Sequence, residues 1–270
     1  MTQSPPNLRL PNFLIVGTMK SATTSLADLL GSHPDCYLAP RELHFFNHDD
    51  RYALGADHYA TQFKDAGQAI AVGEKTPSYS EQVRHPNIPG RIRQTLGPVK
   101  LVWIFREPVA RTISHYRHAV VQKAIRAPFD AVISRELETG NYTAAPIVAR
   151  SLYSEQVKLY LAHFPRDMMH FCLFEDFVKD PVSVTASVAQ FLGLDPSSKH
   201  FTGSASRNRT GERASDQKEK AGLLGRILLA RRDKLLNSAS PTMQARLKQH
   251  FAAPNADLAH LTGLDLKAWS

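Results

Sequence analysis

The chain has 270 residues, of which 43% are hydrophobic, so it is long enough to bury a sizeable core. Thirty-three lysines and arginines against 25 aspartates and glutamates give a formal net charge of +8. This charge favours an anionic partner such as a nucleotide, an acidic glycan, nucleic acid or a membrane surface. The two cysteines, Cys36 and Cys172, lack the paired spacing of a metal site or a redox motif, which indicates a reducing compartment.

The apolar run at 13–16 is far too short for a signal or membrane segment. We therefore expect one soluble, cytoplasmic domain over 1–270, whose first segment, 1–11, is flexible.

Strands and helices are expected to alternate along the chain. Buried apolar runs of strand length occur at 13–16, 101–105 and 168–174. Helical patterns occur at 25–30, 108–121, 152–164 and 182–192. This alternation predicts a three-layer α/β/α fold with a central, mostly parallel sheet. The polar segment 197–220 is expected to be a long loop, and closing helices are expected at 223–236 and 243–251.

The segment from Gly17 to Ser25 follows the first predicted strand and opens the first predicted helix. In that setting, backbone N–H groups and the positive end of the helix can converge on an anion. Lys20 adds a charge, and the hydroxyl groups of the loop add hydrogen-bond donors. The loop is not the nucleoside-triphosphate loop, where Gly-Lys-Ser/Thr follows four spacer residues. An ordinary strand-to-helix turn capped by Ser or Thr is the alternative.

Arg106 directly follows the predicted strand 101–105, at the sheet edge where α/β proteins bind ligands. Ser114 follows eight residues later on the next predicted helix. One guanidinium and one hydroxyl can share a phosphate. A solvated arginine at the end of a strand is the alternative.

Charge is mixed with aromatic residues in the segment 41–47. If this segment is extended, Glu42, His44 and Phe46 share one face. Desolvation beside aromatic rings would then raise the pKa of the Glu42 carboxyl and make it a better general base. The alternative is a surface glutamate next to a core phenylalanine pair.

Lys75 and Thr76 follow the apolar run 69–72 and precede a turn-forming proline, which places them near another strand end. The alternative is that Glu74 and Lys75 form a solvated ion pair. For Tyr79, packing and binding remain equally open.

Two of these segments resemble motifs of the sulfotransferases that use 3′-phosphoadenosine 5′-phosphosulfate (PAPS). The loop Lys20-Ser21-Ala22-Thr23-Thr24 matches the first, and Arg106 to Tyr116 matches the second. Two such matches, in the right order and about ninety residues apart, are far rarer by chance than either alone. The resemblance implies a P-loop-like fold and an enzyme that moves a sulfuryl group from PAPS to a hydroxyl or amine.

The same resemblance implies the residues that bind the donor. Lys20 would act on the oxygen that bridges phosphate and sulfate, and Arg106 with Ser114 would bind the 3′-phosphate. The 5′-phosphosulfate would be held by the first loop, which comprises Lys20, Ser21, Ala22, Thr23, Thr24 and Ser25. A basic loop of the family covers the 3′-phosphate, and Arg207 or Arg209, which the sequence does not distinguish, would take this role. A merely solvated basic loop is the alternative.

On the acceptor side, segment 41–47 resembles the Lys-Glu-x-His-Phe-Phe stretch of heparan-type and related bacterial sulfotransferases. The resemblance implies that Glu42 is the catalytic base, with His44 as the fallback and then His115 or His118, since cytosolic small-molecule sulfotransferases generally use histidine. Some glycan enzymes carry an aspartate where this chain has Asn47, and the difference weighs against a heparan-like acceptor.

The segment 73–79 is similar to the family motif Glu-Lys-Thr-Pro-x-Tyr, and Lys75 would therefore face the reaction centre. No carboxylate or cysteine cluster completes a site with His115 and His118, so we expect no metal requirement. The acceptor, whether glycan, lipid, phenol or small metabolite, stays open, and we expect neither a nucleic-acid partner nor a membrane span. A nucleotide-dependent kinase and a non-catalytic nucleotide or polyanion sensor are the competing hypotheses.

Overall fold

The structure is a computed structural model that describes residues 8–81, 83–140, 146–202 and 232–269. The chain divides into two compact units. The first unit comprises 1–106 and 155–205, and the second comprises 107–154 and 206–270. The single domain expected from the sequence stays a prediction.

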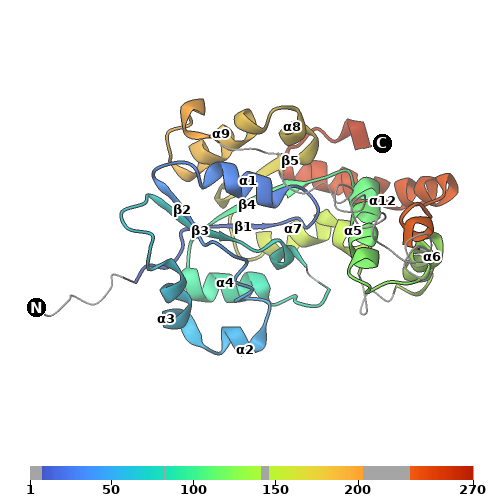
Figure 1. The fold of residues 1–270 in the computed structure, drawn as a ribbon, viewed down its shortest axis with the longest axis horizontal. Helices are drawn as coiled ribbons and strands as arrows, with labels where there is room; N and C mark the ends of the chain where they lie inside the picture. The colour runs from blue at the N-terminus through green and yellow to red at the C-terminus, as the bar shows by residue number, and fades with distance from the viewer. Residues whose placement is uncertain (1–7, 82, 141–145, 203–231, 270) are drawn as a thin grey trace, which may run out of the picture. The chain divides into compact units, whose positions relative to one another are not determined.

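A five-stranded sheet forms the centre of the first unit (Figure 1). Its strands are β1 (Phe13–Gly17), β2 (Cys36–Leu38), β3 (Ala71–Lys75), β4 (Lys100–Phe105) and β5 (Met169–Leu173). Their order is β2-β3-β1-β4-β5, and each neighbouring pair is parallel. Because parallel strands put their carboxyl ends at one edge, loops after β1, β3 and β4 meet there. The predicted α/β fold with a parallel sheet is confirmed.

Helices cover both faces of this sheet (Figure 1). They are α1 (Thr23–Leu30), α2 (Asp49–Tyr52), α3 (Gly55–Ala60), α4 (Ile88–Leu96), α7 (Tyr153–Leu161), α8 (Phe174–Lys179) and α9 (Pro181–Leu192). On one face, α1, α8 and α9 pack with Ile15 and Ile104 in a continuous apolar core. The opposite face is aromatic, with the Trp103 ring 5.0 Å from that of Tyr160 on α7. Successive residues of a strand point to opposite faces, so Trp103 and Ile104 of β4 serve different cores.

The second unit is helical. Its longer helices are α5 (Pro108–Val121), α6 (Phe129–Thr139) and α12 (Pro241–Thr262). Their apolar faces meet in one core that includes Tyr116, Phe129 and Phe251. Pro108 occupies the first turn of α5, as predicted, because its missing N–H and fixed φ suit that position.

The last helix, α12, differs from its prediction at 243–251. It runs on through Pro254 and ends at Thr262. Leu258 is fully buried, so burial of the helix beyond the proline offsets the lost backbone hydrogen bond. Most of the predicted helix at 223–236 and of the predicted loop at 197–220 lies outside the described residues. None of the described helices is long and apolar enough to cross a membrane.

Candidate active site

The predicted phosphate loop lies at the carboxyl edge of the sheet, between β1 and α1. Thr18 fastens it to β4, because its backbone N–H and its Oγ1 both donate to the carbonyl oxygen of Ile104 at 3.0 Å. The Thr18 Oγ1 also lies 2.8 Å from the Oγ of Ser21. Ser21 is fully buried, and its hydroxyl takes part in the loop's internal bonding; its contact with an anion stays a prediction.

The backbone of this loop is shaped for an anion. Lys20 and Ala22 both adopt left-handed conformations, with φ of 76° and 63°. Residues that alternate between right- and left-handed regions turn their N–H groups toward one concave side, which binds anions. Within the part of the chain that the structure describes, no side chain caps the start of α1 at Ala22, so the helix N–H groups face the same region. This geometry fits the phosphate cradle predicted from sequence.

Arg106 lies beside this loop. Its Nη1 donates to the carbonyl oxygen of Lys20 at 3.2 Å, and its guanidinium stacks over the Phe174 ring at 4.4 Å. The strand end thus places a second cation next to the phosphate loop. Ser114 is half-buried on α5 in the second unit, and its pairing with Arg106 stays a prediction. Arg207 and Arg209 lie outside the described residues.

Three predicted acceptor-side residues come together in the first unit. The Nζ of Lys75, at the end of β3, lies 3.0 Å from the Oε1 of Glu42. The same Nζ donates to the Oγ1 of Thr24, in the phosphate loop, at 3.1 Å. The Nε2 of His44 lies 3.4 Å from the Oε2 of Glu42. Lys75 therefore links the proposed base to the proposed donor site.

The electrostatics of Glu42 correct the sequence prediction. Burial raises the pKa of the Glu42 carboxyl, but hydrogen bonds from His44 and Lys75 outweigh burial and hold that pKa below its usual value. The side chain is 37% exposed, so water also solvates the charged form. Glu42 is therefore an ionised carboxylate at neutral pH, and the expected increase in basicity by desolvation is wrong.

The segment around Glu42 does not have the extended conformation under which Glu42, His44 and Phe46 would share one face. No strand forms at 42–46, and His44 has a φ of 53°. The Nδ2 of Asn47 lies 3.4 Å from the Nδ1 of His44 and donates to the Oγ of Ser78 at 3.0 Å. Because an amide nitrogen can only donate, a bond to Nδ1 keeps the imidazole proton on Nε2, which faces Glu42. An aspartate at this position would accept from Nδ1 and favour the other tautomer.

The other candidate histidines belong to the second unit. His115 is buried, and its ring nitrogens lie 3.4 Å from Nη1 of Arg111 and 3.2 Å from Nη1 of Arg150. His118 lies on the same helix, α5. Across the described ranges, no three His, Cys, Asp or Glu side chains gather closely enough to hold a metal ion. The expected independence from metal stays a prediction.

Glu74 is the residue whose environment sequence analysis missed. Its side chain is fully buried, so the solvated Glu74–Lys75 pair is wrong. The two residues point to opposite faces of β3, and only Lys75 reaches Glu42 and Thr24 with its side chain. The Oε1 of Glu74 accepts from the hydroxyls of Tyr59 and Tyr79, at 2.6 and 2.8 Å. Its Oε2 accepts from the Oγ1 of Thr76 at 2.7 Å. Strand alternation was the available signal for this burial.

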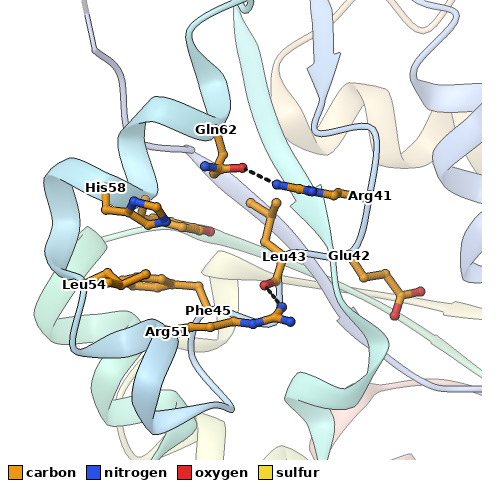
Figure 2. Close-up of a pocket in the computed structure, with 9 residues that line it drawn as sticks. Arg41, Glu42, Leu43, Phe45, Arg51, Leu54, His58 and Gln62 are labelled. Carbon is orange, nitrogen blue, oxygen red and sulfur yellow. Dashed lines mark hydrogen bonds between the residues drawn. The ribbon is translucent and has the colours of Figure 1, made fainter.

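Two cavities flank the segment that carries Glu42. The first has a volume of about 340 Å³ and is lined by basic side chains, Arg41, Arg51 and His58, together with aromatic and apolar groups. Figure 2 shows the Glu42 carboxylate turned away from His58, at the margin of this cavity. The second, of about 300 Å³, is lined by Lys75 among others, and Arg41 borders both. The proposed base thus lines the first cavity and contacts Lys75, which lines the second.

Comparison with known proteins agrees with this geometry. Residues 10–220 match the family model described as "Sulfotransferase domain". The chain is 32% identical over 203 residues to heparan sulfate glucosamine 3-O-sulfotransferase 6 of Homo sapiens, covering 74% of this chain and 58% of that protein. It is 31% identical over 196 residues to the 3-O-sulfotransferase 3A1 of Mus musculus, covering 72% and 49%. The chain spans about half the length of these curated relatives.

Solved structures show the same fold. A sulfotransferase from Alicyclobacillus acidocaldarius superposes with a TM-score of 0.74 at 27% identity, covering 97% of this chain and 99% of that one. The sulfotransferase domain of an olefin synthase from Synechococcus PCC 7002 superposes with a TM-score of 0.54 at 19% identity, covering 93% and 98%. The second likeness concerns the fold alone.

Proposed function

Because this chain belongs to the sulfotransferase domain family, we propose that it transfers a sulfuryl group from PAPS to a hydroxyl or amine of an acceptor. The observation that carries the proposal is the contact of Lys75 with both Glu42 and Thr24. This lysine joins a carboxylate that can accept a proton to a loop that can hold a phosphosulfate.

The donor would be held by the phosphate loop. The N–H groups around Lys20 and Ala22 form the concave side, and Arg106 supplies a further positive charge next to it. The Lys20 ammonium would stabilise the bridging oxygen as negative charge develops there, which lowers the barrier more than it stabilises the ground state. Arg106 would bind the 3′-phosphate.

The transfer step would be an in-line displacement. Glu42 takes a proton from the acceptor hydroxyl or amine, and that oxygen or nitrogen forms a bond to sulfur. The bond between sulfur and the bridging oxygen breaks, and its electron pair leaves on 3′-phosphoadenosine 5′-phosphate (PAP). Lys75 would orient Glu42 and lie near the transferred group. Holding both reactants in line supplies much of the rate enhancement.

The acceptor would approach Glu42 from the cavity of Figure 2. Arg41, Arg51 and His58 make this cavity basic, which favours an acceptor that carries a carboxylate, phosphate or sulfate. The named relatives are heparan sulfate glucosamine sulfotransferases, so a sulfated or carboxylated sugar is the first class to test. Small anionic phenols and alcohols are the second class.

Binding of the nucleotide product tests the donor. Isothermal calorimetry is run with PAP and with ATP, each with and without Mg²⁺. We expect PAP to bind without Mg²⁺ and more tightly than ATP. Tighter binding of ATP that depends on Mg²⁺ would indicate a kinase and overturn the proposal.

Substitution of the base tests catalysis. Glu42→Gln removes the proton acceptor while keeping the size of the side chain, so transfer of radiolabelled sulfate should fall by about 10²-fold with PAP affinity unchanged. Glu155→Gln is the matched control, since Glu155 also lies 3.0 Å from a lysine, Lys158, but on an exposed helix surface. Equal activity of the two variants would remove Glu42 from the mechanism. If neither variant transfers sulfate, the result would favour a nucleotide sensor.

A further inference from the structure

The segment 43–46, after Glu42, has no secondary structure of its own, yet all four of its backbone N–H groups have partners. The N–H of Leu43 donates to the Oε2 of Glu74 at 3.3 Å, and the N–H of His44 lies 3.4 Å from the Oγ1 of Thr76. The N–H groups of residues 45 and 46 both point to the hydroxyl of Tyr79, at 2.9 and 3.4 Å. Four consecutive backbone donors therefore end on side chains from the segment 74–79. Buried N–H groups need partners, so this set of contacts fixes the path of the loop.

Two arginines bind backbone carbonyl groups of the same loop. The Nη1 of Arg51 donates to the carbonyl oxygen of Leu43 at 2.5 Å (Figure 2). The Nη1 of Arg91 donates to the carbonyl oxygen of Phe46 at 3.1 Å. The backbone at His44 adopts a left-handed conformation, which persists only where surrounding contacts determine it. Side-chain hydrogen bonds thus hold the backbone of the segment 43–46 in place.

Glu74 is the central acceptor in this set of hydrogen bonds. It is fully buried, and its two oxygens accept four hydrogen bonds: from Tyr59 and Tyr79 on Oε1, and from Thr76 and the N–H of Leu43 on Oε2. Burial raises the pKa of Glu74, and these four donors oppose the rise. Burying a charged group is costly unless it is fully hydrogen-bonded. The proposed transfer chemistry makes no direct use of this carboxylate.

Two neighbouring residues of β3 restrain Glu42, one through the backbone and one through its side chain. Glu74 points inward and holds the backbone one residue after Glu42, while Lys75 points to the other face and holds its carboxylate. We infer that Glu74 is a positioning residue, which fixes the loop at 43–46 so that Glu42 stays against Lys75 and faces the phosphate loop. This inference rests on the proposed sulfuryl transfer with Glu42 as base.

The chemistry of the amide makes Glu74→Gln a sharp test. A carboxylate accepts at both oxygens, whereas a glutamine accepts at one and donates at the other. If its NH₂ replaces Oε2, it opposes the N–H of Leu43. If the NH₂ takes the place of Oε1, the hydroxyl of Tyr79 loses its acceptor. This hydroxyl already accepts hydrogen bonds from the N–H groups of residues 45 and 46. In both orientations the loop loses a hydrogen bond that holds its backbone. We therefore expect Glu42 to move away from Lys75.

The expected result separates positioning from simple loss of structure. In Glu74→Gln, kcat for acceptor sulfation should fall by about 10- to 100-fold, because a displacement near 1 Å has this effect. PAP affinity and the KM for PAPS should stay within about twofold of the unchanged protein, since the phosphate loop is untouched. The acidic limb of the pH–rate profile should move to higher pH, because Glu42 loses the contacts with Lys75 and His44 that lower its pKa.

A matched pair of tyrosine variants keeps the inference falsifiable if Glu74→Gln fails to fold. Tyr79→Phe removes the hydroxyl that holds two loop N–H groups, whereas Tyr59→Phe removes a hydroxyl that donates to Glu74 without any loop contact among its described bonds. Tyr79→Phe should lower kcat and move the acidic limb several times more than Tyr59→Phe does. Glu136→Gln, in the second unit, is the control: its carboxylate is also buried and accepts two backbone N–H bonds.

Four outcomes are distinguishable. A shifted acidic limb with unchanged PAP affinity in Glu74→Gln and Tyr79→Phe, absent in Glu136→Gln, supports the inference. Equal losses in all variants with no shift of the limb overturn it, because they indicate general destabilisation. Unchanged kcat in a folded Glu74→Gln also overturns it. Failure of the unchanged protein to bind PAP overturns the proposed function itself, which the calorimetry detects before any variant is made.

Discussion

Ala22 offers a test of the phosphate-loop geometry through stability. It is the residue before the first turn of α1, with φ 63° and ψ 22°. In the left-handed region the Cβ of an L-residue crowds the following carbonyl oxygen, which costs about 1–2 kcal/mol. Glycine avoids this cost but loses roughly 0.5–1 kcal/mol more conformational entropy on folding. The net prediction for Ala22→Gly is a gain of about 0.5–1 kcal/mol in the free energy of unfolding.

The assay is equilibrium unfolding in urea, followed by circular dichroism, with PAP affinity measured alongside. The gain should raise the midpoint of thermal unfolding by roughly 1–4 °C for a chain of this length. Ala27→Gly is the control, because Ala27 lies in the interior of the same helix and packs against its core. There glycine should lower stability by about 1 kcal/mol. If both variants lose stability equally, Ala22 is not left-handed and the concave loop described above is incorrect.

Three further predictions follow from the first unit. In Lys75→Met the pKa of Glu42 should rise, since the lysine lowers it, so the acidic limb of the pH–rate profile moves to higher pH and turnover falls by about 10²-fold. Steady-state kinetics across pH measures both, and an unmoved limb would contradict the ion pair. Gly73→Ala should lower the free energy of unfolding by about 1–3 kcal/mol, because the added Cβ would lie 2.5 Å from the Phe13 ring. Unfolding in urea measures this loss, and an unchanged midpoint would refute the close contact. The two cysteine thiols are buried, which raises the pKa of each to about 12, so a thiol reagent should label them only in denaturant; rapid labelling of the native protein would contradict their burial.

The sequence alone was sufficient for β1 and β4 in the centre of the sheet and for the edge strand β5. β1 and most of β4 are buried, so each appears as a continuous apolar run with a clear end, and β5 appears as an apolar run interrupted only by the half-buried His170. The other edge strand, β2, has only three residues and is partly exposed, so its apolar run is too short to stand out from the flanking sequence. Local pattern therefore identified the strands that form long apolar runs, whereas the buried strand β3 is interrupted by Gly73 and Glu74 and was recognised only as a strand end near Lys75.

Two segments differ from their local pattern, because local pattern does not report tertiary contacts. The end of a helix was expected before Pro254, but buried side chains beyond it keep α12 continuous. The extended conformation considered for 42–46 does not form, because side chains of the segment 74–79 bond its backbone and His44 adopts a left-handed conformation. In both cases, groups distant in sequence decide the backbone conformation.

The types of residue at the site were set by the sequence: a lysine and hydroxyls after β1, an arginine after β4, and a carboxylate beside a histidine. What those residues do depends on distances that arise only when the chain folds. Glu42 is a low-pKa carboxylate because Lys75 and His44 reach it, and Glu74 is buried because β3 turns it inward. Charge and hydrogen-bonding capacity are properties of a residue, whereas solvation and the field of neighbouring charges are properties of a place in the fold.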